Sequence, residues 1–510
     1  MGGLVALLAG AIAPLGFAPF EIWPLSILSC ALLLACLQAS PKPRQAAWIG
    51  WLYGVGFFGV GVSWVYVSIN QFGNAPPWLA GSLTAAFVMA MALFFSLHGY
   101  LHRRLINRSP WSIWLGFGAL WVLAEWFRSW FLTGFPWLLL GYAGIDNWLA
   151  GWAPLTGVYG LSGFSALLAA ALYLIVSYPG RQSLLRLGLS LLPFALGALL
   201  QQHSWTQSAP TAPIRVALVQ GNIPQELKWH PDYRDSIIDH YLSLSEPLLE
   251  EGTDKADLII WPETAIPLLY HQARARLQGF DAQLSRSRTG LISGIPYRSA
   301  LEPNTPPRFH NSIMALGSAD GLYHKQRLVP FGEYVPLEKW LRGLIDFFDL
   351  PMSSFSLGPE QQPALQLAQP DTTIKLSASI CYEIVYPDLI ASGAKQSQLL
   401  LTISNDSWFG DSLAPHQHLQ MARMRALENG RYLLRATNNG ISALVSPQGE
   451  LLFQGPQFVV DVLQLTAEPM IGLTPFTRLG STPVLVLCLL LLGLLQFRTP
   501  LPKPHSKDAV

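Results

Sequence analysis

The sequence predicts a membrane protein in which an eight-helix transmembrane region carries an α/β extracytoplasmic domain. Two observations predict this fold class. Of the 510 residues, 51% are hydrophobic and only 12% are charged, whereas a soluble globular chain has about 25% charged residues. The charges are also uneven, because residues 1–210 hold 8 Lys and Arg with 3 Asp and Glu, while residues 211–479 hold 21 and 27. These features exclude a soluble enzyme, a disordered chain and a nucleic-acid-binding protein, which would need a basic face.

The composition divides the chain into three parts. Residues 1–210 hold transmembrane helices 1–7, residues 211–479 form the extracytoplasmic domain, and residues 480–510 supply a closing transmembrane helix and a cytoplasmic tail. Several apolar stretches approach the roughly 20 residues that a helix needs to cross a bilayer. The expected spans lie near residues 3–19, 22–39, 46–69, 78–101, 111–131, 150–178, 184–200 and 482–497. The first is read as a span rather than a signal peptide, since no charged region or obvious cleavage site accompanies it.

The positions of Lys and Arg between the spans predict the orientation. The turns near residue 20 and at 70–77 contain neither residue type, whereas the alternate turns and the C-terminal end are basic. The basic positions are Lys42, Arg44, Arg103, Arg104, Arg108, Arg181, Arg186, Arg498, Lys503 and Lys507. Basic loops stay in the cytoplasm, so both termini are expected there and residues 211–479 on the outer side. Residues 131–147 are apolar but interrupted by Gly and Pro, which favours a re-entrant or interfacial segment.

The outer domain alternates short runs rich in Val, Ile and Leu with helical stretches, a pattern typical of a sheet covered by helices. Strands are expected near residues 214–222, 256–264, 291–297, 310–317, 374–383 and 398–410. A helical stretch is expected at 233–251, an amphipathic helix at 416–434 and a hairpin-like pair of strands at 436–452.

Several patterns in the chain resemble functional motifs but are better explained by structure. Gly54, Gly56 and Gly59 form G-x-G-x-x-G inside an apolar span, without the acidic residue of a dinucleotide site, so close helix packing is expected. Glu125 and Arg128 are costly near a span end, and they either pair with each other or serve a lipid headgroup. Two pairs of closely spaced histidines lack a third ligand and are not expected to bind metal. These pairs are His98 with His102 and His416 with His418.

The cysteines separate into two groups. Cys30, Cys36 and Cys488 lie in apolar spans, where a free thiol acts as a small hydrophobic side chain. Cys381 is the only cysteine of the outer domain and has no disulfide partner there. In a compartment that favours disulfides, a lone thiol is either buried and inert or kept for its chemistry.

A further strand is expected to end at GLYH, before residues 325–333 enter a Pro- and Gly-containing loop. Polar residues then stand just past the carboxyl ends of three expected strands: Glu263 after LIIWP, Lys325 after GLYH and Cys381 after SASI. Sites in layered α/β domains commonly form at such strand ends. Singly, the glutamate could cap a helix, the lysine could be solvated and the cysteine could be part of the core. Together they supply a base, a cation and a nucleophile. The carboxylate can take the thiol proton, and the lysine can lower the thiol pKa and stabilise an oxyanion. No histidine lies beside Cys381 in the sequence, which disfavours a Cys-His protease.

Four strings, LIIWPET, HKQRLVPFGEYVP, ICYE and TISNDSWFG, resemble the carbon–nitrogen hydrolase (nitrilase) superfamily. The order of the parts along the chain, with several spans before such a domain and one closing span after it, resembles that of the apolipoprotein N-acyltransferase family. The resemblance implies a nitrilase-like α-β-β-α sandwich in which Cys381 is the nucleophile, Glu263 the general base and Lys325 the oxyanion-side cation. It also implies supporting roles for four further residues. These are Glu333, Tyr382, Glu383 and Trp229 of ELKWH.

The implied reaction is ping-pong acyl transfer. Cys381 would take a fatty acyl chain from a phospholipid as a thioester and pass it to the α-amine of S-diacylglyceryl-cysteine in an apolipoprotein, completing triacylation. The implied partners are the phospholipid, the lipoprotein and the bilayer, and no nucleic acid, cofactor or metal is expected. The implied location is the bacterial inner membrane, with the catalytic domain on the periplasmic side. The run LIDFFDLPMSSF (344–355) is a candidate lid, unless it packs on its own domain.

Two other functions remain open at this level. The same triad would serve a membrane-tethered amidase acting on a small amide, although such a substrate needs no seven-span block. A transporter or lipid-binding scaffold with a degenerate outer domain is the second alternative. The scarcity of charged residues in the spans disfavours a carrier, and the intact set of triad residues disfavours degeneracy.

Overall fold

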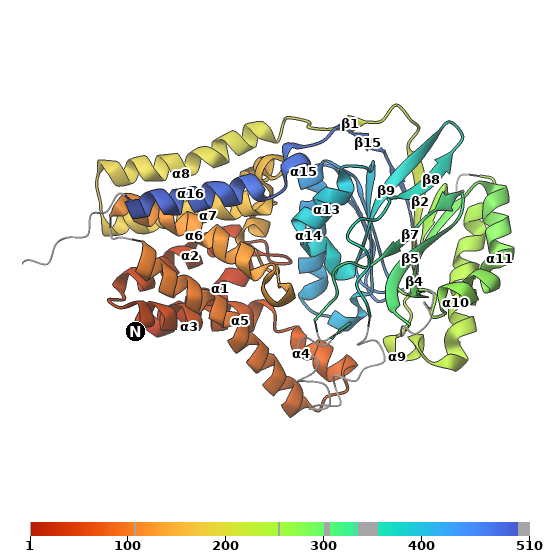
Figure 1. Ribbon diagram of the computed structural model, residues 1–510, viewed down its shortest axis with the longest axis horizontal. Coiled ribbons are helices and arrows are strands. Elements are labelled where there is room, and N and C mark those ends of the chain that lie inside the picture. Colours follow the sequence, from red (N-terminus) through yellow and green to blue (C-terminus); the bar gives the residue numbers. More distant parts are fainter. Residues whose placement is uncertain are drawn as a thin grey trace, which may run out of the picture.

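The computed structural model describes residues 2–106, 109–252, 255–299, 307–330, 332–334 and 355–497. Apolar helices form one side of the molecule, and an α/β domain forms the other (Figure 1). The helices of the first part are α1 (Gly2–Ile12), α2 (Trp23–Ala39), α3 (Pro43–Gly61), α4 (Val65–Val67), α5 (Pro77–Leu105), α6 (Pro110–Arg128), α7 (Ala153–Ser177), α8 (Arg181–Leu200) and α16 (Thr482–Phe497). Although α16 ends the described chain, it lies beside α6 and α7 (Figure 1).

Only some of these helices are long and apolar enough by themselves to cross a membrane. Three described helical segments meet that test: Pro77–Leu105, Trp148–Ser177 and Arg181–Leu200. The segments Pro43–Gly61 and Val65–Phe72 meet at a bend of 63° and would form a fourth span together. Shorter apolar helices occupy Gly2–Gly16, Trp23–Ala39 and Thr482–Gln496. An apolar helix therefore lies at each expected position, while the number of crossings, expected to be eight, stays a prediction.

The glycine pattern in α3 serves helix packing, as the sequence predicts. A Cβ at Gly54 would lie 2.7 Å from Ala92 Cα on α5, and a Cβ at Gly56 would lie 2.1 Å from the Leu7 carbonyl oxygen on α1. Neither distance leaves room for a methyl group, so these positions allow α3 to approach the helices on both sides.

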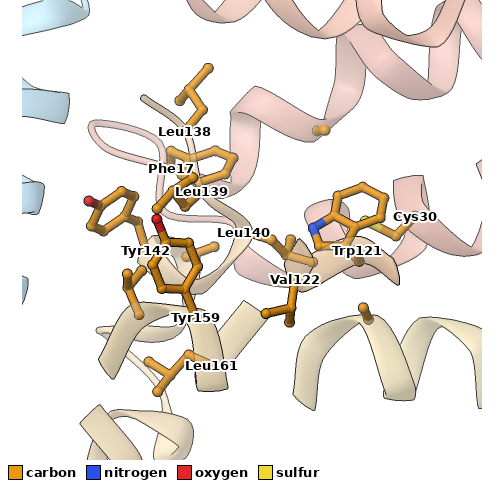
Figure 2. Packing of buried hydrophobic residues seen from close by; sticks show 14 of the residues in the cluster. Phe17, Cys30, Trp121, Val122, Leu138, Leu139, Leu140, Tyr142, Tyr159 and Leu161 are labelled. Atoms are coloured by element: carbon orange, nitrogen blue, oxygen red, sulfur yellow. The ribbon is translucent and has the colours of Figure 1, made fainter. Parts of the chain in front are cut away.

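Residues 131–147 contain short 3-10 turns, η3 (Phe131–Thr133) and η4 (Leu140–Gly144), joined by irregular backbone. The side chains of Leu138, Leu139, Leu140 and Tyr142 are buried. Figure 2 shows them among Trp121 and Val122 of α6, Tyr159 and Leu161 of α7, and Phe17, which lies between α1 and α2. Residues 134–145 are therefore largely internal to the protein, where irregular backbone can find hydrogen-bond partners, whereas residues 131–133 are exposed.

Two mixed sheets form the centre of the α/β domain. The six-stranded sheet has the order β14-β2-β3-β4-β5-β7, and the seven-stranded sheet has the order β13-β12-β11-β10-β9-β8-β6. The first sheet consists of β14 (Asp461–Ala467), β2 (Ile214–Gln220), β3 (Leu258–Ile260), β4 (Gly290–Arg298), β5 (Phe309–Gly317) and β7 (Leu322–His324). The second consists of β13 (Leu451–Gln454), β12 (Ala443–Val445), β11 (Leu433–Thr437), β10 (Leu399–Ser404), β9 (Thr372–Ile380), β8 (Leu365–Gln369) and β6 (Ala319–Asp320). A small sheet pairs β1 (Gln207–Ser208) with β15 (Met470–Ile471).

The two large sheets pack face to face, and helices cover both outer faces. Leu218 and Ile260 of the first sheet share a buried apolar cluster with Leu401 and Leu434 of the second. Helices α10 (Arg234–Ser245) and α11 (Tyr270–Ser287) lie over the six-stranded sheet, and α13 (Pro387–Ala394) and α14 (Ala414–Asn429) over the seven-stranded one (Figure 1). The expected α-β-β-α sandwich is confirmed.

Helix α14 lies between the seven-stranded sheet and the membrane helices, in contact with α7 (Figure 1). A helix is present here as expected, but the sequence predicts an amphipathic helix, with one apolar and one polar face. In the structure both faces are buried, and Gln417, Gln420 and Glu428 are each at most 3% exposed. Their partners come from the membrane part, by which we mean residues 2–200 together with α16. Gln417 accepts a 2.6 Å hydrogen bond from Trp137 Nε1, and Glu428 accepts one of 2.8 Å from the backbone amide of Val158.

Candidate active site

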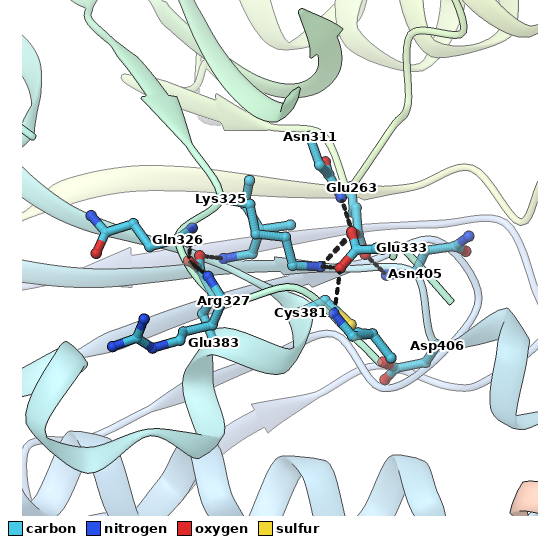
Figure 3. A network of polar contacts seen from close by, with 12 residues as sticks. Glu263, Asn311, Lys325, Gln326, Arg327, Glu333, Cys381, Glu383, Asn405 and Asp406 are labelled. Carbon is cyan, nitrogen blue, oxygen red and sulfur yellow. Dashed lines mark hydrogen bonds and ion pairs between the residues drawn. The ribbon is translucent and has the colours of Figure 1, made fainter. Parts of the chain in front are cut away.

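The structure brings Glu263, Lys325 and Cys381 together between the two sheets (Figure 3). Glu263 follows β3, Lys325 follows β7 and Cys381 follows β9, so each stands just beyond the carboxyl end of its strand. Strands β2, β3 and β4 run parallel in one sheet, and β9, β10 and β11 in the other. This strand-end location is the one that the sequence predicts.

Lys325 is shared by two carboxylates. Its Nζ lies 3.4 Å from Glu263 Oε1 and 2.9 Å from the Glu333 carboxylate, and its side chain is only 1% exposed. Asn311 Nδ2 donates to both carboxylates, at 2.7 Å to Glu263 and 2.8 Å to Glu333. Burial alone would lower the pKa of the Lys325 ammonium, but Glu333 and Glu263 outweigh burial and raise that pKa. The lysine therefore remains charged.

Glu263 is held at both its carboxylate and its backbone. Its Oε2 accepts a 2.9 Å hydrogen bond from the Asn405 amide, and its carbonyl oxygen accepts one of 2.9 Å from Lys228 Nζ. Lys228 is buried in helix α9 (Gln225–Lys228), and burial lowers its pKa to about 8 despite the opposing charge of Glu263. A glutamate fixed in this way keeps one orientation toward the thiol.

Cys381 begins the 3-10 turn η9 (Cys381–Val385), and its side chain faces the Glu263–Lys325 group (Figure 3). Its φ is +51°, in the left-handed region, which costs a non-glycine residue roughly 1–3 kcal/mol. Burial and the Glu263 charge raise the pKa of its thiol well above the ordinary value, and Lys325 only partly opposes them. Lys325 does lower the thiol pKa, as expected, but the combined effect of burial and Glu263 is larger, so the thiol pKa is raised overall. The resting thiol is protonated and needs a base to attack.

Glu383 connects the backbone that follows Lys325 to the backbone next to Cys381. Its carboxylate accepts hydrogen bonds from the amides of Gln326 and Arg327 at 2.5 and 3.2 Å, and from the Ile380 amide at 2.7 Å. The Tyr323 hydroxyl also donates to it at 3.0 Å. Burial raises the pKa of Glu383 to about 7, although these donors and Lys325 oppose the rise. Glu383 therefore sets the distance between the backbone next to Lys325 and the backbone next to Cys381.

The other expected supporting residues occupy different places. Tyr382 donates from its hydroxyl to the Gly134 carbonyl oxygen at 3.0 Å, so it joins the catalytic domain to residues 131–147. Trp229 directly follows α9, next to Lys228, and its Nε1 is buried without a hydrogen-bond partner among the described residues. The candidate lid, residues 344–355, lies outside the described residues except for Phe355.

Sequence reasoning missed Asn311, Asn405 and Lys228. Asn311 lies in the string HNSIMALG and Asn405 in SNDSWFG, so each falls inside the range of an expected strand, 310–317 or 398–410. A polar residue at a buried strand end was the available signal. What each one contacts depends on how the two sheets face each other.

Glu125 and Arg128 make hydrogen bonds to the backbone of residues 131–147. Glu125 Oε1 accepts hydrogen bonds from Trp121 Nε1 and the Leu140 amide, at 2.9 and 2.7 Å. Arg128 Nη1 donates to the carbonyl oxygens of Phe135 and Trp137, at 3.0 and 2.6 Å. Both therefore hold the backbone of residues 131–147. Within the described part of the chain, no three His, Cys, Asp or Glu side chains are grouped as a metal site would require.

Comparisons with known proteins agree with this arrangement. A family model described as apolipoprotein N-acyltransferase N-terminal domain matches residues 9–171, and one described as carbon–nitrogen hydrolase matches residues 215–471. An apolipoprotein N-acyltransferase of Azotobacter vinelandii is 48% identical over 96% of this chain and 94% of its own length. That of Coxiella burnetii is 40% identical over 96% and 99%.

A solved carbon–nitrogen hydrolase from Helicobacter pylori G27 is 17% identical and superimposes with a TM-score of 0.37, covering 50% of this chain and 89% of that one. The identity and coverage of the curated relatives are decisive, because they extend over the membrane helices as well as the catalytic domain. The chain belongs to the apolipoprotein N-acyltransferase family.

Proposed function

We propose that this protein transfers a fatty acyl chain from a phospholipid to the N-terminal amine of S-diacylglyceryl-cysteine in apolipoproteins, through a thioester on Cys381. Family membership supports the reaction class. The observation that carries the assignment of residues is the position of Lys325, held between two carboxylates beside a protonated thiol. That group contains the base, cation and nucleophile that acyl transfer requires.

In the first half-reaction, Glu263 takes the thiol proton as Cys381 Sγ attacks the ester carbonyl carbon. The electron pair of the carbonyl moves to its oxygen, where the Lys325 ammonium stabilises the negative charge. Collapse of this intermediate breaks the ester C–O bond, and the leaving lysophospholipid oxygen receives the proton from Glu263. The acyl chain remains on Cys381 as a thioester.

In the second half-reaction, the lipoprotein amine attacks the thioester carbonyl and Glu263 removes a proton from its nitrogen. The C–S bond breaks, and the proton returns through Glu263 to the Cys381 sulfur. The product is an amide. Because the thioester keeps the acyl group activated, neither half-reaction consumes a nucleotide.

The membrane helices present the catalytic domain to lipid substrates. We place residues 211–479 on the periplasmic face of the bacterial inner membrane, with both termini in the cytoplasm. The basic turns at Lys42, Arg103 and Arg181 support this orientation. A cysteine at Glu251, on the exposed surface of the outer domain, should react with a membrane-impermeant maleimide in intact spheroplasts. A cysteine at Arg44 should react only after lysis.

The acyl-enzyme is tested by intact mass measurement of purified protein given phospholipid without acceptor. Wild type should gain the mass of a fatty acyl chain, and neutral hydroxylamine should remove it. C381S should form no hydroxylamine-sensitive adduct. A folded wild type that never acquires the adduct would contradict the phospholipid-donor mechanism.

The acceptor is tested by adding a diacylglyceryl-cysteine peptide to the isolated acyl-enzyme. The acyl mass should leave the protein and appear on the peptide amine. Loss of the acyl group as free fatty acid at the same rate with or without the peptide would indicate a hydrolase instead. Turnover of a small aliphatic amide, with no adduct from phospholipid, would favour the membrane-tethered amidase.

A further inference from the structure

The backbone of Cys381 is held by a histidine that the reaction scheme does not use. His418 of α14 is fully buried, and its Nε2 lies 3.1 Å from the Cys381 carbonyl oxygen. A carbonyl oxygen only accepts hydrogen bonds, so Nε2 must carry a proton and donate. The contact joins residues 37 positions apart in the chain. Neither composition nor motif spacing reveals it.

The other nitrogen of the His418 ring is fixed by a buried ion pair. Arg435 Nη2 lies 3.0 Å from His418 Nδ1 and 2.7 Å from Asp406 Oδ2, and Asp406 Oδ1 lies 3.2 Å from the same Nδ1. Burial and the Arg435 charge lower the pKa of His418 and favour the neutral ring. In the neutral ring Nδ1 accepts from Arg435, which only donates, and the single proton stays on Nε2.

Contacts with the membrane part fix the plane of the ring. Trp137, in the buried segment that follows α6, stacks on His418 with ring centroids 5.7 Å apart and planes at 29°. Its Nε1 donates to Gln417, the neighbour of His418 on α14, at 2.6 Å. Phe409 contacts the same imidazole edge-on at 6.1 Å. The imidazole therefore has one orientation, with Nε2 toward the nucleophile.

We propose that His418 is a positioning residue for the nucleophile: its Nε2–H holds the Cys381 carbonyl and thereby keeps Cys381 in the left-handed conformation that presents the thiol to Glu263 and Lys325. This inference rests on the proposed role of Cys381. His418 does not touch the reacting atoms. It acts by fixing the peptide plane that follows the nucleophile, and Trp137 extends this support into the membrane part.

The test compares H418L, which removes the donor, with H418Q, whose side-chain N–H can replace it. The control is H416L, two positions away on α14, where the histidine is only partly buried. In single-turnover acylation, H418L should lose about 10- to 100-fold in the maximal rate with an unchanged half-saturating phospholipid concentration, because a small misplacement of a reacting group costs this much. H418Q should recover most of the rate, and H416L should match wild type.

A second readout does not depend on phospholipid. Alkylation of Cys381 by a haloacetamide, followed on its own peptide, should be slower in H418L than in H418Q or wild type. If wild type forms no acyl-enzyme, the proposed function fails, yet this comparison still decides the role of His418. Wild-type rates in folded H418L, or equal losses in H418L and H418Q, would overturn the inference.

Folding is monitored by thermal unfolding of every variant. If H418L does not fold, H418M takes its place because its volume is closer to that of histidine. If neither H418L nor H418M folds while H418Q is fully active, the maximal rate of single-turnover acylation in H418N tests the inference instead. Its shorter amide cannot reach the Cys381 carbonyl, and a wild-type rate in folded H418N would overturn the inference.

Discussion

Two buried charged clusters meet at Cys381, and they differ in net charge. The thiol-side cluster consists of Glu263, Glu333 and Lys325, so it has one more carboxylate than cations. The carbonyl-side cluster consists of Asp406, Arg435 and His418, in which one carboxylate balances one guanidinium. The unbalanced cluster contributes to the high thiol pKa and supplies the base, whereas the balanced cluster holds the backbone. The comparison separates the residues that do chemistry from those that hold geometry.

The sharpest way to break this comparison is to remove the base from the thiol-side cluster. E263Q should lower the rate of acyl-enzyme formation by about 100- to 10,000-fold, the usual contribution of a general base. The amide keeps the shape of the side chain, so the thermal unfolding midpoint should change far less than the rate. Rapid-quench acylation with phospholipid measures the effect. A rate within a few-fold of wild type would show that another group takes the thiol proton.

Removing the cation from the same cluster should damage both stability and rate. In K325M, Glu263 and Glu333 face each other without the ammonium between them. Breaking a buried pair from one side costs about 3–5 kcal/mol, and losing an oxyanion stabiliser costs about 100- to 1,000-fold in rate. The double variant K325M/E333Q should regain part of the unfolding free energy but none of the acylation rate. Recovery of the rate in the double variant would show that Lys325 has only a structural role.

Local patterns were sufficient to predict the strands that end at Glu263, Lys325 and Cys381. Strand β3 is a short run of buried aliphatic residues, β9 ends on the buried Ile380, and β7 is the three-residue strand Leu322–His324. A polar residue follows the end of each strand. The partners of these residues were not predicted, because Asn311, Asn405 and His418 reach the site from separate elements. Their proximity depends on two sheets packing face to face, which spacing along the chain does not encode.

The polar face of α14 could not be placed from sequence for a related reason. Its Gln, His and Glu residues are spaced like those of a solvent-exposed helix surface, yet the membrane part covers them. Arg425 and Glu428, both fully buried, form an ion pair at 3.1 Å in this interface. A helix that supports a catalytic turn on one side and a membrane bundle on the other has no solvent face. Hydrophobic periodicity therefore predicts a solvent-exposed face for α14 that the structure does not have.

The carbonyl-side cluster should be broken at a smaller cost, and mainly in stability. D406N leaves the fully buried Arg435 without its charged partner, which should lower the unfolding free energy by about 3–5 kcal/mol without removing a reacting group. The more exposed pair Arg215–Asp257, whose side chains are 44% and 20% exposed, gives a control, in which D257N should cost less than about 1 kcal/mol. Chemical denaturation of both variants in detergent measures the difference. Equal losses would show that burial adds nothing to the Asp406–Arg435 pair.

The same aspartate has a signed pH dependence. Burial opposes ionisation of Asp406, but the interactions that favour its carboxylate, chiefly the Arg435 charge, outweigh burial and hold the pKa of Asp406 below the ordinary value. Its contribution to stability is therefore present above the ordinary aspartate pKa and lost as pH falls through the lowered one. D406N should flatten this part of the curve of unfolding free energy against pH. An unchanged acid limb would show that Asp406 is not ionised in the folded protein.

The smallest expected effects are opposite shifts of the Cys381 thiol pKa, and they test the charge imbalance directly. Glu263 raises this pKa and Lys325 lowers it, so E263Q should move the midpoint of Cys381 alkylation to lower pH and K325M to higher pH. E333Q should move it in the same direction as E263Q but less, because the Glu333 contribution is the weaker one. The measurement follows haloacetamide labelling of the Cys381 peptide across alkaline pH, since Cys30, Cys36 and Cys488 lie in the membrane part. Shifts of the same sign in E263Q and K325M would mean that burial, rather than the excess carboxylate, sets the state of the thiol.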